Sequence, residues 1–114
     1  MIRLSLRLQA DGCLRSFSAT GHAGAGPKGR NLACAAATVL LRTVARLLSA
    51  QSDLRVSGQA PAEGEMRLAL EPPPPARREW VRGVTATLVA GLTDLDREFP
   101  GRLKLDVGEE GNGT

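Results

Sequence analysis

The sequence predicts an α+β domain in which two helices pack on a mostly antiparallel sheet. Apolar and polar residues alternate in several short segments, and two longer segments repeat apolar residues every three or four positions. The resulting order is strand, strand, helix, strand, strand, helix, strand. The length of 114 residues suits one domain, which we place at residues 1–107.

The first two strands are expected to form a hairpin. Every second residue of the first segment is apolar: Ile2, Leu4, Leu6 and Leu8. This alternation is typical of a half-buried strand. Asp11-Gly12 is a strong turn signal, so residues 13–20 are predicted to be the hairpin partner.

A glycine-rich loop and a helix follow. Residues 21–29 contain four glycines and Pro27, too many for regular structure, and we expect a mobile loop. The helix is predicted to begin at Leu32 and to end near residues 50–52, with Asn31 as its N-cap. Its expected apolar stripe is Leu40, Val44, Leu47 and Leu48.

The second half is expected to contain another strand pair, a helix and a last strand. A strand pair is predicted at residues 54–56 and 66–70, then a rigid proline spacer at 72–75. The second helix is expected over residues 77–99 and a last strand over 103–107. The second helix has an apolar face of Val81, Val84, Leu88, Leu92, Leu95 and Phe99. Residues 108–114 are polar and glycine-rich, and we expect a disordered tail.

Composition narrows the functional classes. Fifteen basic and twelve acidic residues give a net charge of +3, which is mild for a nucleic-acid binder, so we expect no direct nucleic-acid partner. No apolar run is expected to be long enough to span a membrane. The segment 2–8 lacks the continuous apolar block of a signal peptide. We therefore expect a cytoplasmic protein without membrane association, whose two cysteines stay reduced.

The sequence offers little for a metal or a cofactor. One histidine and two distant cysteines do not make a four-ligand metal set. No phosphate-binding loop or dinucleotide fingerprint is present. We expect neither a metal nor a cofactor.

The chemistry is expected where the glycine-rich loop meets the first helix. The chain's single histidine, His22, lies in the loop, and Cys34 lies in the first turn of the predicted helix. The positive end of a helix dipole favours thiolate over thiol, and a nearby imidazole can accept the thiol proton. Backbone N–H groups around Ala35 and Ala36 could stabilise an oxyanion.

Each of these features has an ordinary structural explanation. A cysteine on a helix is more often a small buried hydrophobe, a histidine in a loop is usually solvated, and glycine-rich loops before helices often bind anions. The joint order favours a catalytic site: Gly21-His22-Ala23-Gly24, further glycines, then Asn31 and Cys34-Ala35-Ala36 at a helix start. Cys13, in a predicted strand, is expected to serve packing.

This pattern resembles the signature of the bacterial ribosomal-processing cysteine protease family. The resemblance is carried by Gly21-His22-Ala23-Gly24, Gly29, Cys34-Ala35-Ala36 and Leu40, and it extends over roughly residues 1–107. It implies a cysteine endopeptidase that removes the N-terminal extension of large-subunit ribosomal protein twenty-seven and so supports ribosome assembly. It also implies a homodimer, with Cys34 as nucleophile and His22 as general base and proton donor. Gly21, Gly24, Gly29, Ala35 and Ala36 are the expected substrate-binding positions.

One position departs from the family pattern. The family usually has Asp three residues before its cysteine, and this chain has Asn31. Asn31 can orient the imidazole without adding charge, or it can cap the helix as well as Asp does; we favour the cap. The missing acid and the mild positive charge keep an alternative open, a non-catalytic ribosome-associated binding module. A purely structural dimer, with the loop as an anion site, is a weaker third.

Overall fold

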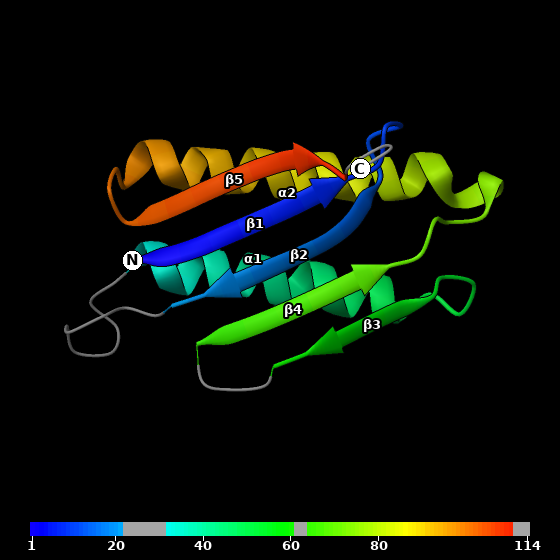
Figure 1. Cartoon of the computed structure of the whole chain (residues 1–114), viewed down its shortest axis with the longest axis horizontal. Coiled ribbons are helices and arrows are strands. Elements are labelled where there is room, and N and C mark those ends of the chain that lie inside the picture. Colours follow the sequence, from blue (N-terminus) through cyan, green and yellow to red (C-terminus); the bar gives the residue numbers. More distant parts are fainter. Residues whose placement is uncertain (22–31, 61–63, 111–114) are drawn as a thin grey trace.

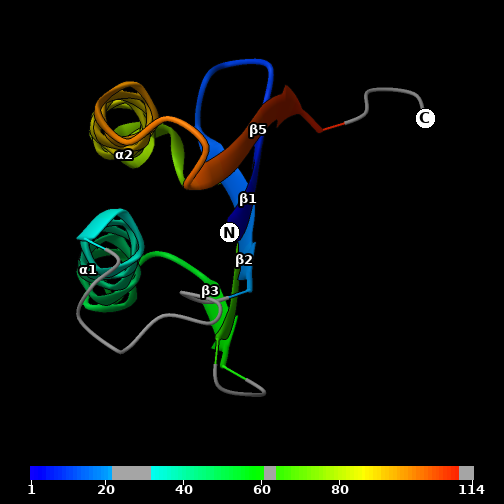
Figure 2. The ribbon, with the colours of Figure 1, turned by 90° about the vertical axis from the view of Figure 1, so that its left-hand side faces the viewer.

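The structure, a computed structural model, describes residues 1–21, 32–60 and 64–110. Two helices lie against one face of a five-stranded sheet with strand order β3-β4-β2-β1-β5 (Figures 1 and 2). The strands are Ile2–Leu8 (β1), Leu14–Thr20 (β2), Val56–Gln59 (β3), Glu65–Leu70 (β4) and Leu103–Glu109 (β5). The helices are Leu32–Ser49 (α1) and Arg78–Glu98 (α2), and a short 3₁₀ turn, η1 (Pro75–Arg77), leads into α2.

Three of the four strand pairs are antiparallel, and β1 pairs with β5 in parallel. The alternation in β1 buries Ile2, Leu4 and Leu6 on the helix side. The hairpin turn is confirmed, and its Gly12 has a φ of +90°, a conformation that favours glycine. The predicted α+β fold and its element order are therefore confirmed.

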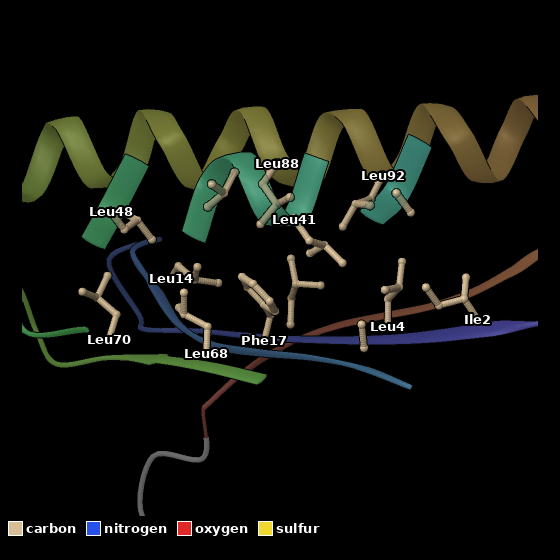
Figure 3. Packing of buried hydrophobic residues seen from close by; sticks show 14 of the residues in the cluster. Ile2, Leu4, Leu14, Phe17, Leu41, Leu48, Leu68, Leu70, Leu88 and Leu92 are labelled. Carbon is tan, nitrogen blue, oxygen red and sulfur yellow. The ribbon is translucent and has the colours of Figure 1, made fainter. Parts of the chain in front are cut away.

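The core lies between the sheet and the two helices. Figure 3 shows Leu41 and Leu48 of α1 and Leu88 and Leu92 of α2 facing the side chains of the sheet. The facing residues of the sheet include Leu4, Leu14, Phe17, Leu68 and Leu70. Burying one large apolar side chain of this kind stabilises the fold by about 1.5–3 kcal/mol. The core therefore fixes α1, and with it Cys34, against the sheet.

The buried stripe of α1 differs from the predicted one. Its buried residues are Ala33, Ala37, Leu41, Val44 and Leu48. Leu47 is 41% exposed, and its place in the predicted stripe is wrong. The stripe runs instead through two alanines, whose small side chains give a weak hydropathy signal although both are fully buried.

The expectation about membrane-spanning length also needs correction. α1 is 18 residues long with a mean hydropathy of 1.5, and by length and composition it could cross a membrane. Arg42 and Arg46 are its only charged residues. A core helix meets the same criterion, and the buried residues of α1 belong to the core described above.

Two strands differ in extent from the predicted ones. β3 covers Val56–Gln59 instead of 54–56. Leu54, which was expected to open the strand, is a buried residue in the chain before β3. β5 continues through Gly108 and Glu109, so the predicted tail starts too early. The backbone N–H of Glu110 also donates to the carbonyl of Leu8 at 2.7 Å. These ladder bonds act on the backbone, so a polar sequence does not reveal them.

The junction between η1 and α2 is built around Trp80. The Arg77 guanidinium lies 4.6 Å from the centroid of the Trp80 ring, a cation–π arrangement. Arg77 also forms an ion pair with Asp53 at 3.1 Å and a hydrogen bond with Gln51, beyond the end of α1. Trp80 is half-buried and packs against the core, so it joins the start of α2 to the chain that leaves α1.

Candidate active site

Cys34 is the third residue of α1 and is half-buried. Its neighbours Ala33 and Ala37 are buried against the sheet, so the helix cannot rotate without disturbing the core. The first turn of α1 contains no acidic residue that would compete for the positive end of the helix dipole. This is the placement that the sequence predicted for the thiol.

The start of α1 also defines which N–H groups are available. In a helix that begins at Leu32, the N–H groups of the first residues, such as Leu32 and Ala33, have no acceptor one turn earlier in the helix. The N–H of Ala36 lies one turn further on and is used within the helix. The predicted oxyanion donors around Ala35 and Ala36 stay a prediction, and the N–H of Ala33 is a further candidate in the same turn.

Cys34 lines a cavity of about 680 Å³ at one end of the sheet. The cavity lies between the first half of α1, the start of β1, the end of β2 and the start of β4. Its lining residues are Ile2, Ala19, Gly21, Cys34, Ala35, Thr38, Val39, Leu41, Arg42, Ala60, Gly64, Glu65 and Met66. Most of these described residues are apolar or small. Arg42 and Glu65 are charged, and the strand register turns the Glu65 side chain toward the opposite face of the sheet.

Gly21 is required where the chain leaves β2. It has a φ of +88°, and a Cβ at this position would lie 2.6 Å from the carbonyl oxygen of Met1. Any other residue would both strain the backbone and collide with it. Gly21 also lines the cavity, and in the sequence it is the residue before His22.

Thr38 lies one turn after Cys34 and lines the same cavity. Its Oγ1 donates a hydrogen bond of 2.8 Å to the carbonyl oxygen of Cys34. The hydroxyl is thereby bound to the backbone of the turn that carries the thiol, which restricts the Thr38 rotamer.

Cys13 has a different environment. It is fully buried immediately before β2, and its Sγ lies 3.5 Å from the carbonyl oxygen of Arg78. Burial and the neighbouring Asp11 raise the pKa of the Cys13 thiol to about 11, so it stays protonated at neutral pH. The predicted packing role is confirmed, and no disulfide joins Cys13 to Cys34.

The remaining predicted site residues lie outside the described residues. These are His22, Gly24, Gly29 and Asn31, and their roles stay predictions. Within residues 1–21, 32–60 and 64–110, no three His, Cys, Asp or Glu side chains are grouped to bind a metal.

Several cavity residues were not found from the sequence. Met66 and Glu65 come from β4, far from Cys34 along the chain, and only the sheet topology brings them close. Val39 could have been found from the sequence, because it is an apolar residue on the polar side of α1. In the structure its side chain is 61% exposed.

The family model of the cysteine protease Prp matches residues 1–104. No curated protein sequence matches the chain.

Solved structures share the fold. One is an essential ribosomal processing protease Prp from S. aureus with a covalently linked product peptide, with a TM-score of 0.77 and 17% identity over 94% of this chain and 99% of that one. The same protease with a substrate peptide gives a TM-score of 0.74 and 16% identity over the same shares. The protein SMU.848 from Streptococcus mutans gives 0.73 and 25% identity over 96% of both chains. Because the family model covers most of its length, the chain belongs to the cysteine protease Prp family and is a cysteine protease.

Proposed function

We propose that this protease removes the N-terminal extension of large-subunit ribosomal protein twenty-seven, with Cys34 as nucleophile and His22 as general base. The single observation that carries the proposal is Cys34 in the first turn of α1, lining a cavity large enough for a peptide segment. Family membership supports the reaction class. The S. aureus structures with substrate and product peptides support a ribosomal peptide as substrate.

The reaction begins with proton transfer from the Cys34 thiol to the His22 imidazole. The thiolate attacks the scissile carbonyl carbon, and the carbonyl oxygen takes up the negative charge. N–H groups at the start of α1, such as that of Ala33, donate to this oxygen, with the helix dipole adding to the stabilisation.

Collapse of this intermediate breaks the peptide C–N bond. The imidazolium of His22 gives its proton to the leaving amine, and a thioester to Cys34 remains. A water molecule, deprotonated by His22, then attacks the thioester carbon. The carbon–sulfur bond breaks, and the Cys34 sulfur leaves as the thiolate, or as the thiol with the proton that His22 holds.

The cavity favours a flexible peptide with apolar or small side chains. Ile2, Val39, Leu41 and Met66 supply apolar surface near Cys34. Arg42 lies on the same lining and can bind polar groups of the peptide. Such a site binds an extended chain terminus more readily than a folded surface.

We further propose that the enzyme is cytoplasmic and acts as a homodimer.

A peptide that spans the junction between extension and mature protein, taken from the host's own ribosomal protein, tests the proposal. The wild-type protein is expected to cut it once, as seen by mass spectrometry. Cys34→Ala is expected to abolish cleavage, because no other group supplies the attacking sulfur. Cys13→Ala is the matched control and should retain activity, because Cys13 is buried and protonated.

Two results would contradict the proposal. An intact peptide after incubation with the wild type would reject this substrate. Undiminished cleavage by Cys34→Ala would reject the nucleophile. Tight binding of the peptide without cleavage would instead favour the alternative, a ribosome-associated binding module.

A further inference from the structure

The face of the sheet opposite the helices is uncovered by any described element. Figure 2 shows α1 and α2 on one side of the sheet, with neither on the other. The strand register places alternate residues of each strand on this open face. They are Arg3, Ser5 and Arg7 of β1, Ser16, Ser18 and Thr20 of β2, Glu65, Arg67 and Ala69 of β4, Ser57 and Gln59 of β3, and Lys104 and Asp106 of β5.

Positive charge exceeds negative charge on this open face. Arg7 forms an ion pair of 2.8 Å with Asp106, so these two charges compensate each other. In the part of the chain that the structure describes, Arg3, Arg67 and Lys104 form no ion pair. Glu65 is the other carboxylate on the face, so a surplus of positive charge remains.

A shallow hollow of about 500 Å³ lies in the middle of the open face. Its described lining includes four serines and the amide of Gln59; the serines are Ser5, Ser16, Ser18 and Ser57. Its charged lining residues among those described are Arg7 and Arg67, both cationic.

This combination of groups is suited to phosphate. Guanidinium groups donate two parallel hydrogen bonds to phosphate oxygens, and serine hydroxyls donate one each. None of the face residues identified from the register is aromatic, so base stacking is not available. Such a surface binds a nucleic-acid backbone without reading its sequence.

We propose that the open face binds the phosphate backbone of RNA. The inference rests on the proposed function, because its proposed substrate is a ribosomal protein and ribosomes contain RNA. It differs from the expectation drawn from composition, which considered the net charge of +3. The net charge does not reveal the positive charge of the open face, because several of the acidic residues lie on the helices and in the turns.

The experiment measures binding of a fluorescently labelled 20-nucleotide single-stranded RNA by anisotropy. Binding is expected at low salt, with log K falling linearly with log salt, by about 0.7 for each phosphate neutralised. Arg67→Gln and Lys104→Gln should each weaken binding about fivefold, and the double variant more than tenfold. Amide NMR shifts on adding the RNA should map to β1, β2, β4 and β5.

The matched control is Arg97→Gln, which removes the same charge from an exposed position on α2. It should leave RNA binding within twofold of the wild type. Equal weakening by Arg97→Gln, no binding at low salt, or shifts confined to the helices would overturn the inference. A change in oligomeric state with Arg67→Gln, seen by light scattering, would also overturn it and identify the open face as a contact between two copies.

The peptidase assay separates this inference from the proposed function. Arg67 and Lys104 do not line the cavity of Cys34, so both variants should cleave the peptide at the wild-type rate. Loss of RNA binding with retained cleavage supports the inference. Retained cleavage with no RNA binding by any form of the protein overturns the inference and leaves the proposed protease function intact.

Discussion

At the scale of single residues, the core contains a buried polar side chain, that of Thr85. In the part of the chain that the structure describes, no other polar residue is buried in this way. The Oγ1 of Thr85 accepts a hydrogen bond of 2.9 Å from the N–H of Leu14 and donates one of 2.8 Å to the carbonyl of Val81. Leu14 opens β2, so one hydroxyl links α2 to the start of a central strand.

Thr85→Val is expected to lower the free energy of unfolding by about 1–3 kcal/mol, because the N–H of Leu14 would be buried without a partner. Chemical denaturation measures the change. Thr87→Val is the control: Thr87 makes the same bond to the carbonyl four residues earlier but is exposed. A change of less than about 0.5 kcal/mol is expected there, and equal effects would contradict the role assigned to Thr85.

Asp11, in the hairpin turn, makes a pH-dependent contribution to the free energy of unfolding. The backbone N–H of Cys13 donates to its carboxylate at 3.0 Å, and this bond, helped by Arg78 at 3.3 Å, lowers the pKa of Asp11 below 3.8. A group whose pKa is lower in the folded state stabilises the protein above its unfolded pKa. This stabilisation is lost as the pH falls through the folded pKa.

Asp11→Asn should therefore destabilise the protein at pH 7 and have a smaller effect at pH 2.5. The expected loss at pH 7 is below about 1 kcal/mol, because the pair with Arg78 is partly exposed. Urea denaturation of both proteins at the two pH values measures the difference. A difference that does not change with pH would show that the charge of Asp11 is unimportant.

At the scale of elements, two glycines in α2 have opposite surroundings. A Cβ at Gly83 would meet nothing within 4 Å, whereas a Cβ at Gly91 would lie 2.6 Å from Cδ2 of Leu40 on α1. Gly91 thus allows α1 and α2 to approach closely, and Gly83 serves no such purpose.

Gly83→Ala is expected to raise the free energy of unfolding by about 0.5–1 kcal/mol, because alanine loses less backbone entropy in a helix. Gly91→Ala has the same favourable effect on backbone entropy, but the Leu40 side chain must move in a packed interface. We expect it to be about 1 kcal/mol less stable than Gly83→Ala. Thermal denaturation of the two variants measures this gap, and equal stabilities would show that the helices tolerate a side chain between them.

The same scale shows what the sequence could predict. Alternation in residues 2–8 and helical spacing in the second long segment were sufficient for β1 and α2, because each buries one regular face. The edge strand β3 was misplaced, since Ser57, Gly58 and Gln59 are exposed and carry no apolar pattern. The α1 stripe was misjudged because Ala33 and Ala37 are buried.

At the scale of the whole molecule, the pairing of strands that lie far apart in the chain could not be predicted from the sequence. Local patterns do not say that β5 pairs with β1 in parallel or that β2 lies between β1 and β4. The position of Cys34 at a helix start was predictable, because helix starts have local signals. The cavity was not, because it needs β1, β2 and β4 to meet at one end of the sheet.

The pairing of β1 with β5 has a consequence for synthesis. β1 is made first, but its second neighbour comes from residues 103–109, the last strand of the sheet. Until those residues emerge, a nascent chain presents an unpaired edge that can pair with another polypeptide. Products that stop before residue 103 should therefore self-associate.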